Sequence, residues 1–184
     1  MKNYTLKDGR TLTIYRPRAA DAEEILEYLK IVGGETNFLL MGSEGVSLTV
    51  EQEREYLERA HNSQRGAFFF GRIEAADGKT PKGEIALSCM VSAHPQKRLA
   101  HVCEIAISVR KDFWGLGVGS AAMREMIEFA QGIGARNIEL GVYANNERAK
   151  ALYSRFGFVE VGRRKNRFCV DGEYFDEILM DLYL

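Results

Sequence analysis

The sequence has few cysteines, no long apolar run and almost equal numbers of acidic and basic residues. Its 184 residues include 3 Cys, and the formal net charge is −1. Because Cys89, Cys103 and Cys169 are far apart, with no CxxC pair or Cys/His cluster, we expect reduced thiols and no metal site. The near-neutral charge gives no argument for nucleic acid or an anionic membrane surface as a partner.

Signals for secretion and for membrane insertion are also missing. The first ten residues lack the apolar stretch of a signal peptide. No segment approaches the roughly 20 apolar residues that span a bilayer. We therefore expect a cytoplasmic protein. The apolar fraction of 46% and the charged fraction of 28% are ordinary for a globular protein, and the length predicts a single domain over 1–184.

Periodicity and turn residues predict strands and helices in mixed order. Thr49 with Gln52, and Asp21 with Glu24, match the capping-box pattern at helix starts. Asp77 to Pro81 is typical of a turn. We expect strands over 11–16, 67–73, 83–92, 100–109, 137–143, 158–161 and 173–184, helices over 21–34, 49–62, 117–132 and 146–156, and an irregular segment over 33–48.

This order predicts a mixed sheet with helices on both faces. The three strands from 67 to 109 follow one another closely and form an antiparallel meander. The strand at 100–109 then reaches the strand at 137–143 through a helix, which is the connection of a parallel pair. The fold class is therefore mixed α/β, with α+β character.

A glycine-rich turn joins the strand ending at Val109 to the following helix. Gly115, Gly117 and Gly119 alternate along it. Glycine permits positive φ and lets a ligand approach the backbone closely, and the free amides at a helix N-terminus attract anions. The turn therefore indicates a phosphate-binding site. A tight turn that merely needs small residues for packing explains the glycines equally well.

A dinucleotide-binding fold is a rival interpretation, because 117–122 fits GxGxxA and Glu139 lies near the position of a ribose-binding acid. Five residues, 110–114, separate the strand from the first glycine, however, and Glu139 lies inside its strand. Both features argue against that fold. A P-loop is excluded because no GK[ST] follows the glycines.

Two motifs together resemble the GNAT acetyltransferase superfamily. The first is Trp-Gly-Leu-Gly-Val-Gly at 114–119, which four residues separate from Val109. The second is Asn-x-x-Ala-x-x-Leu-Tyr at 146–153, followed by Gly157-Phe158. The resemblance covers about residues 100–160. It departs from the family pattern at Trp114, where Gln or Arg is usual. It implies a sheet of about seven strands, largely antiparallel with a central splayed parallel pair, and about four flanking helices.

The resemblance also implies acetyl-CoA as a co-substrate, bound between the splayed strands. The backbone of Ile107 and Val109 would pair with the pantetheine arm, and Asn146 would bind near it. Arg110, Lys111 and Arg148, together with Lys150, are candidates for the outer phosphates, although solvated surface charge explains each equally well. The pyrophosphate would be held by the loop residues Trp114, Gly115, Leu116, Gly117, Val118, Gly119 and Ser120.

Acetyl transfer to an amine needs a base for the ammonium proton, a donor for the thioester oxygen and an acid for the thiolate. Tyr153 follows Asn146 by two helical turns and is our candidate acid; a packed aromatic ring is the alternative. Glu104 is our candidate base, as a partly buried carboxylate beside a cleft; a carboxylate paired with Lys or Arg is the alternative. The backbone N–H of Val109 is the implied donor to the oxygen.

The sequence says less about the amine that accepts the acetyl group than about the cofactor. We expect a small amine, such as a polyamine or aminoglycoside, or a protein N-terminus, with Glu35, Glu44 and Asp112 as candidate pocket residues. The resemblance implies that the acceptor pocket is formed by residues 31–47, which include Phe38 and Leu39, and by residues 163–176. A non-catalytic acyl-CoA sensor and an NAD(P)-binding oxidoreductase remain as alternatives. The exposed strands leave the formation of a homodimer open.

Overall fold

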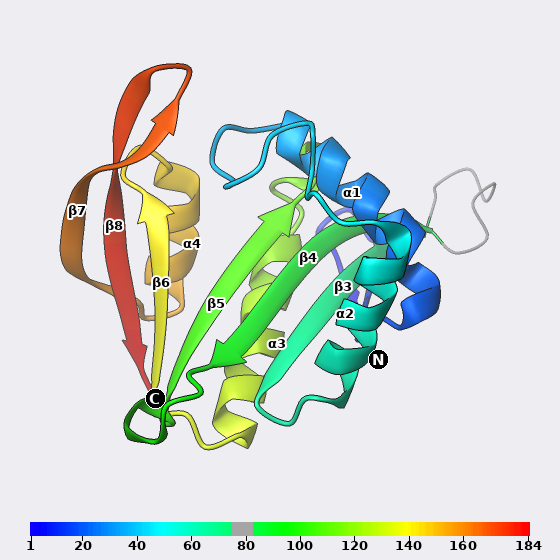
Figure 1. The fold of residues 1–184 in the computed structure, drawn as a ribbon, viewed down its shortest axis with the longest axis horizontal. Coiled ribbons are helices and arrows are strands. Elements are labelled where there is room, and N and C mark those ends of the chain that lie inside the picture. The colour runs from blue at the N-terminus through cyan, green and yellow to red at the C-terminus, as the bar shows by residue number, and fades with distance from the viewer. Residues whose placement is uncertain (75–82) are drawn as a thin grey trace.

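The computed structural model of the protein describes residues 1–74 and 83–184, so the predicted turn at 77–81 lies outside the described residues. Eight strands form one sheet in the order β1-β2-β3-β4-β5-β6-β8-β7 (Figure 1). The strands are β1 Lys2–Thr5, β2 Thr11–Tyr15, β3 Gly66–Ile73, β4 Glu84–Ala93, β5 Val102–Val109, β6 Asn137–Tyr143, β7 Val159–Val170 and β8 Glu173–Tyr183, and the α-helices are α1 Ala22–Gly34, α2 Val50–Asn62, α3 Val118–Gly132 and α4 Glu147–Arg155.

The mixed α/β class predicted from the sequence is confirmed, with one extra strand. The strand β1 escaped prediction because it is only four residues long and mostly exposed, so it carries no alternating apolar pattern. It pairs with β2 as a hairpin at one edge of the sheet. Among the described strands, β5 and β6 form the one parallel pair, and this arrangement rules out the doubly wound parallel sheet of a dinucleotide-binding fold.

One of the two predicted capping boxes forms and the other does not. Thr49 Oγ1 accepts a hydrogen bond from the Gln52 amide at 3.2 Å, and Gln52 Oε1 accepts one from the Thr49 amide at 2.9 Å. Asp21 instead accepts from the amide of Arg18, because a short 3₁₀ helix precedes α1. Glu24 pairs with Arg72 of β3, 2.7 Å from its guanidinium, so the capping box predicted here does not form, although Asp21 is the N-cap of α1 as expected.

Helices cover both faces of the sheet, as predicted. The larger apolar cluster joins α3 to one face and includes Met123, Met126 and Ile105. The smaller cluster joins α1 and α2 to the other face through Ile25 and Leu57. Side chains alternate along each strand, so the side chain of a strand residue belongs to one face or the other.

The strands β5 and β6 separate after three residue pairs. They are in register at 102–104 and 137–139, beyond which no pairing continues, and Figure 1 shows them diverging. On the other side of β5, the amide of Arg110 donates to Ala86 of β4, so even-numbered residues of β5 bond to β4. Because main-chain groups alternate in direction along a strand, those of Ile107 and Val109 face the gap without a strand partner.

A long hairpin and a loop flank this gap. The strand β7 was predicted over 158–161 and in fact runs to Val170, turning into β8 at 171–172. The irregular segment after α1 was predicted as such, and Figure 1 shows it reaching toward the hairpin across the end of β5. The gap between β5 and β6 is thereby enclosed on several sides.

Candidate functional site

A cavity of about 710 Å³ occupies the gap between β5 and β6. Since the gap opens to both faces of the sheet, the cavity has two halves. One, the glycine-loop half, is lined by residues 113–120 except Leu116, by Lys7 and by α4 with its N-cap. The other, the aromatic half, is lined by Phe38, Leu39, Glu104, Gly141, Tyr143, Phe168 and Glu177.

The glycine loop has the backbone geometry of an anion site. Gly115 and Gly117 have φ of +79° and +103°, and nothing lies within 4 Å of where a Cβ would stand on either. Gly117 is also the N-cap of α3 and supplies no side chain to the first helical amides. Those amides, at Val118 to Ser120, therefore remain available to a ligand in the cavity.

Two predicted loop residues have a structural role instead. A Cβ on Gly119 would lie 3.0 Å from Leu152 of α4, so this glycine allows α3 and α4 to pack closely, although it also lines the cavity. Leu116 does not line the cavity. Its carbonyl accepts a hydrogen bond from the amide of Lys7 at 3.0 Å, which fixes the loop to the β1–β2 hairpin.

Trp114 and Arg148 form a pair beside the glycine loop. The indole Nε1 donates to the carbonyl of Val109 at 2.7 Å, and the guanidinium of Arg148 lies 4.1 Å from the ring centroid. Partial burial lowers the pKa of Arg148. Both side chains line the cavity, so Trp114 holds a guanidinium close to the position where the family motif usually has Gln or Arg.

The two polar residues predicted on α4 differ in position. Asn146 lines the cavity as the N-cap of α4, and its Oδ1 accepts a hydrogen bond from the Ala149 amide at 3.1 Å. Its oxygen is thus engaged, which leaves the NH₂ group for a ligand. Lys150 is not among the cavity residues; its Nζ donates to the carbonyl of Ala144 and to Glu147, each at 2.7 Å. The geometry gives no support to Lys150 as a phosphate ligand.

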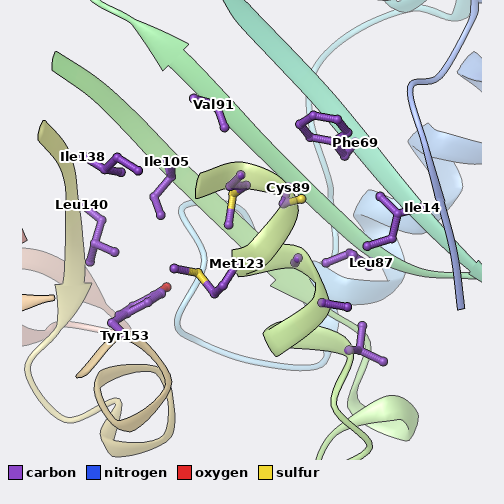
Figure 2. Packing of buried hydrophobic residues seen from close by; sticks show 14 of the residues in the cluster. Ile14, Phe69, Leu87, Cys89, Val91, Ile105, Met123, Ile138, Leu140 and Tyr153 are labelled. Atoms are coloured by element: carbon purple, nitrogen blue, oxygen red, sulfur yellow. The ribbon is translucent and has the colours of Figure 1, made fainter. Parts of the chain in front are cut away.

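Tyr153 lies on α4 at the edge of the cavity. Figure 2 shows its ring between Leu140 of β6 and Met123 of α3, and it is 8% exposed. The structure gives its hydroxyl no hydrogen-bond partner within the described residues. Burial raises the pKa of Tyr153 to about 12, so the phenol keeps its proton at neutral pH.

Glu104 lies on the opposite face of the sheet from Tyr153. The hydroxyl of Ser108, on the same face of β5, is hydrogen-bonded to the hydroxyl of Tyr28 of α1 at 3.0 Å, whereas Ile105 packs with α3. The expectation of a partly buried carboxylate is wrong, since Glu104 is exposed. It does border the cavity, and it has no ion pair or hydrogen bond in the part of the chain that is described.

The other acids expected in a substrate pocket are engaged elsewhere. Glu35 accepts a hydrogen bond from the amide of Lys111 at 2.7 Å and pairs with Arg110. Asp112 also pairs with Arg110, and Glu44 accepts a hydrogen bond from Gly42 within its own loop. None of these three carboxylates lines the cavity, so that expectation is corrected.

Sequence reasoning missed several residues that the fold brings to the cavity. Lys7 comes from the first hairpin and Glu177 from the last, whereas Phe38, Leu39 and Phe168 lie in the two segments expected to form the acceptor pocket. No local motif marks them, because each is placed by strand register over long sequence distances. Tyr143 ends β6, where an apolar aromatic residue alone does not distinguish a cavity wall from the core.

Within 1–74 and 83–184, no helix combines the length and the apolar character needed to cross a bilayer.

Comparison with known proteins assigns the chain to a family. The model of the Acetyltransferase (GNAT) family matches residues 39–158. The L-amino acid N-acetyltransferase AaaT of Escherichia coli is 32% identical over 99 residues, which are 53% of this chain and 61% of that protein. N-alpha-acetyltransferase RimI of Mycobacterium tuberculosis is 32% identical over 54% of this chain and 59% of its own length. The matched region thus spans about three fifths of these curated relatives.

Solved structures share the fold over nearly the whole chain. The acetyltransferase of GNAT family from Streptococcus pneumoniae has a TM-score of 0.84 at 28% identity, covering 94% of this chain and 99% of that one. The yncA protein of Salmonella typhimurium, solved with its cofactor acetyl-CoA, has a TM-score of 0.76 at 16% identity and 94% coverage of both chains, and shows the same fold. On the family match, the two motifs and the splayed sheet, the chain belongs to the acetyltransferase (GNAT) family.

Proposed function

We propose that the protein is an acetyl-CoA-dependent N-acetyltransferase that moves the acetyl group directly to a primary amine while both substrates are bound. The observation that carries this proposal is the single cavity through the splayed sheet. Unpaired main-chain groups of β5, the glycine loop and Tyr153 border it on one side, and Glu104 borders it on the other.

The residues present fit acetyl-CoA, which supplies the activated acetyl group when bound. The open space over Gly115 and Gly117 and the free amides of α3 suit a pyrophosphate. Arg148 and Lys7 add positive charge on the same side. The edge of β5 offers the main-chain groups of Ile107 and the amide of Val109, with which an amide-bearing arm can pair as a further strand would, while the carbonyl of Val109 is engaged by Trp114.

The proposed base, Glu104, and the proposed acid, Tyr153, border the cavity from opposite faces of the sheet. Glu104 removes the proton of the acceptor ammonium, directly or through water, from the aromatic half. The amide of Val109 faces the gap and donates to the thioester oxygen. Tyr153 remains protonated at neutral pH because burial raises its pKa to about 12, and it donates to the sulfur from the glycine-loop half.

Direct transfer is favoured over a covalent acyl-enzyme. Cys103, on β5 near the cavity, is fully buried, and burial raises its pKa, so its thiol is a poor nucleophile. The names of AaaT and RimI refer to amino acids and to α-amino groups. We accordingly propose a small amine or a peptide N-terminus as acceptor.

Thermal unfolding with and without acetyl-CoA tests the proposal. At 100-fold excess over Kd, binding stabilises the folded state by about 2.7 kcal/mol, which is a readily measured rise in Tm. NAD at the same concentration should leave the Tm unchanged. Failure of millimolar acetyl-CoA to raise the Tm would remove the cofactor assignment, whereas binding without turnover of any amine would favour the acyl-CoA sensor.

A further inference from the structure

The two halves of the cavity carry ionisable groups of different sign. Around the glycine-loop half, the cations are Lys7, Arg148 and Arg155, accompanied by Glu147. In the aromatic half, the ionisable lining residues in the described chain, tyrosine aside, are Glu104 and Glu177. A molecule entering the aromatic half therefore meets two carboxylates and no cationic lining residue.

Glu177 is held in a fixed orientation at this wall. Its residue is 7% exposed, and its Oε2 lies 2.9 Å from Arg164 and 3.6 Å from Arg167 of β7. Its Oε1 lies against Gly141 of β6, where any Cβ would collide with it. Oε1 has no hydrogen-bond donor in the described residues. The two arginines of β7 therefore hold Oε2, while Oε1 remains able to accept a hydrogen bond.

Aromatic rings complete the wall between the hairpin and the loop after α1. Tyr143 stacks on Phe168 with ring centroids 3.8 Å apart and an angle of 9° between the planes. Phe38 meets the Tyr143 ring edge-on at 5.6 Å, which joins the loop to β6 across the gap seen in Figure 1. Ring faces attract cations and also bury apolar groups.

From this arrangement we propose that the acceptor is a primary ammonium group on an uncharged, apolar body, with no carboxylate next to the amine. The inference rests on the proposed function and narrows its substrate. The ammonium is received by Glu104 and by Oε1 of Glu177, while the body packs on Phe38, Tyr143 and Phe168. An acceptor carboxylate would face the exposed Glu104 carboxylate and would find no cationic lining residue in this half, because Arg164 and Arg167 are engaged by Oε2 of Glu177.

Matched acceptors that differ in one group test the inference. Phenylalanine amide and phenylalanine share amine and side chain, and the second adds the carboxylate; leucine amide and leucine repeat the comparison. Binding to the complex with CoA is measured by calorimetry at pH 6, below the usual α-amino pKa of about 7.7–8.0. We expect the amides to bind roughly 100-fold more tightly. The same preference should appear in kcat/KM with acetyl-CoA.

Two variants locate the source of the preference. Glu177→Gln keeps the shape of the side chain and removes its charge, so the ratio between amide and free acid should fall by roughly tenfold. Glu173→Gln makes the same change at an exposed position of β8 and should leave the ratio unchanged. The Tm rise with acetyl-CoA, measured on each variant, confirms that it is folded and binds the cofactor.

The outcomes separate the two proposals. Equal or tighter binding of the free amino acids, or no binding of either member of a pair to the CoA complex, overturns the substrate inference while the cofactor assignment stands. An unchanged ratio in Glu177→Gln also contradicts it. If acetyl-CoA does not raise the Tm of the wild-type protein, the proposed function itself is contradicted.

Discussion

At the scale of single residues, burial decides what each candidate group can do. Tyr153 is almost fully buried beside the cavity, and its hydroxyl has no partner within the described chain. Because Tyr153 lines the cavity, an occupant of the cavity can accept a hydrogen bond from its hydroxyl. Glu104 is exposed and has no ion pair or hydrogen bond within residues 1–74 and 83–184, so its carboxylate is open to the cavity that it borders.

Replacing Tyr153 by Phe tests its role as the acid. The change removes one oxygen and retains the ring that packs on Phe158, at a centroid distance of 5.9 Å. We expect kcat to fall by roughly 10²–10⁴. Steady-state kinetics measure it, and an undiminished Tm rise with acetyl-CoA serves as the control. Unchanged kcat would reassign Tyr153 to packing alone.

Trp114 and Arg148 should act as a unit in phosphate binding. Replacing either by Ala is expected to weaken acetyl-CoA binding by about 1–2 kcal/mol, since the guanidinium is lost or no longer held. The double variant should cost less than the sum, because the two side chains are in contact. Acetyl-pantetheine, which lacks the pyrophosphate, is the control ligand. An equal loss of affinity for it would argue against a phosphate contact.

At the scale of elements, one turn serves both folding and binding. Gly117 ends the loop in a positive-φ conformation and caps α3 without a side chain, while Gly119, two residues later, allows α4 to approach. The glycines that looked equivalent in the sequence therefore have different functions. Gly115 and Gly117 leave open space toward a ligand, and Gly119 allows α3 to pack closely against α4.

Alanine at Gly117 should reduce both stability and cofactor affinity. With φ of +103°, a Cβ strains the backbone by roughly 1–2 kcal/mol and also intrudes on the anion site. Gly134 offers a matched control, since it has φ of +80° and open surroundings but lies outside the cavity. Gly134→Ala should lose similar stability in urea unfolding and keep its Kd for acetyl-CoA. Equal Kd values for both variants would contradict the assignment of the loop.

At the scale of the whole molecule, the separation of β5 and β6 creates the site. The sheet is continuous through β4 and β5 on one side and β6 and β8 on the other. The gap between them connects the face covered by α3 with the face covered by α1 and α2. Under the proposed function, acetyl-CoA and the amine approach one point from opposite faces of the sheet.

Hydrogen exchange should report this gap directly. The amides of Ile107 and Val109 face it without a strand partner and should exchange quickly in the free protein. Acetyl-CoA is expected to slow their exchange by about tenfold or more through strand-like pairing. The amide of Ser108 faces β4 and should be protected already, so it is the internal control. Equal exchange of Ile107 with and without acetyl-CoA would count against the placement of the pantetheine arm.

The sequence by itself determined the fold class, the order of the α-helices and of every strand except β1, and the two motifs of the glycine loop and α4. These are local signals, because glycine positions, caps and periodicity depend on neighbours along the chain. Only the tertiary structure decided that Lys7, Phe168 and Glu177 reach the cavity, that Glu35 and Lys150 are engaged elsewhere, and that Glu104 is exposed. Strand register and side-chain pairing over long sequence distances set those positions, and a local pattern does not encode them.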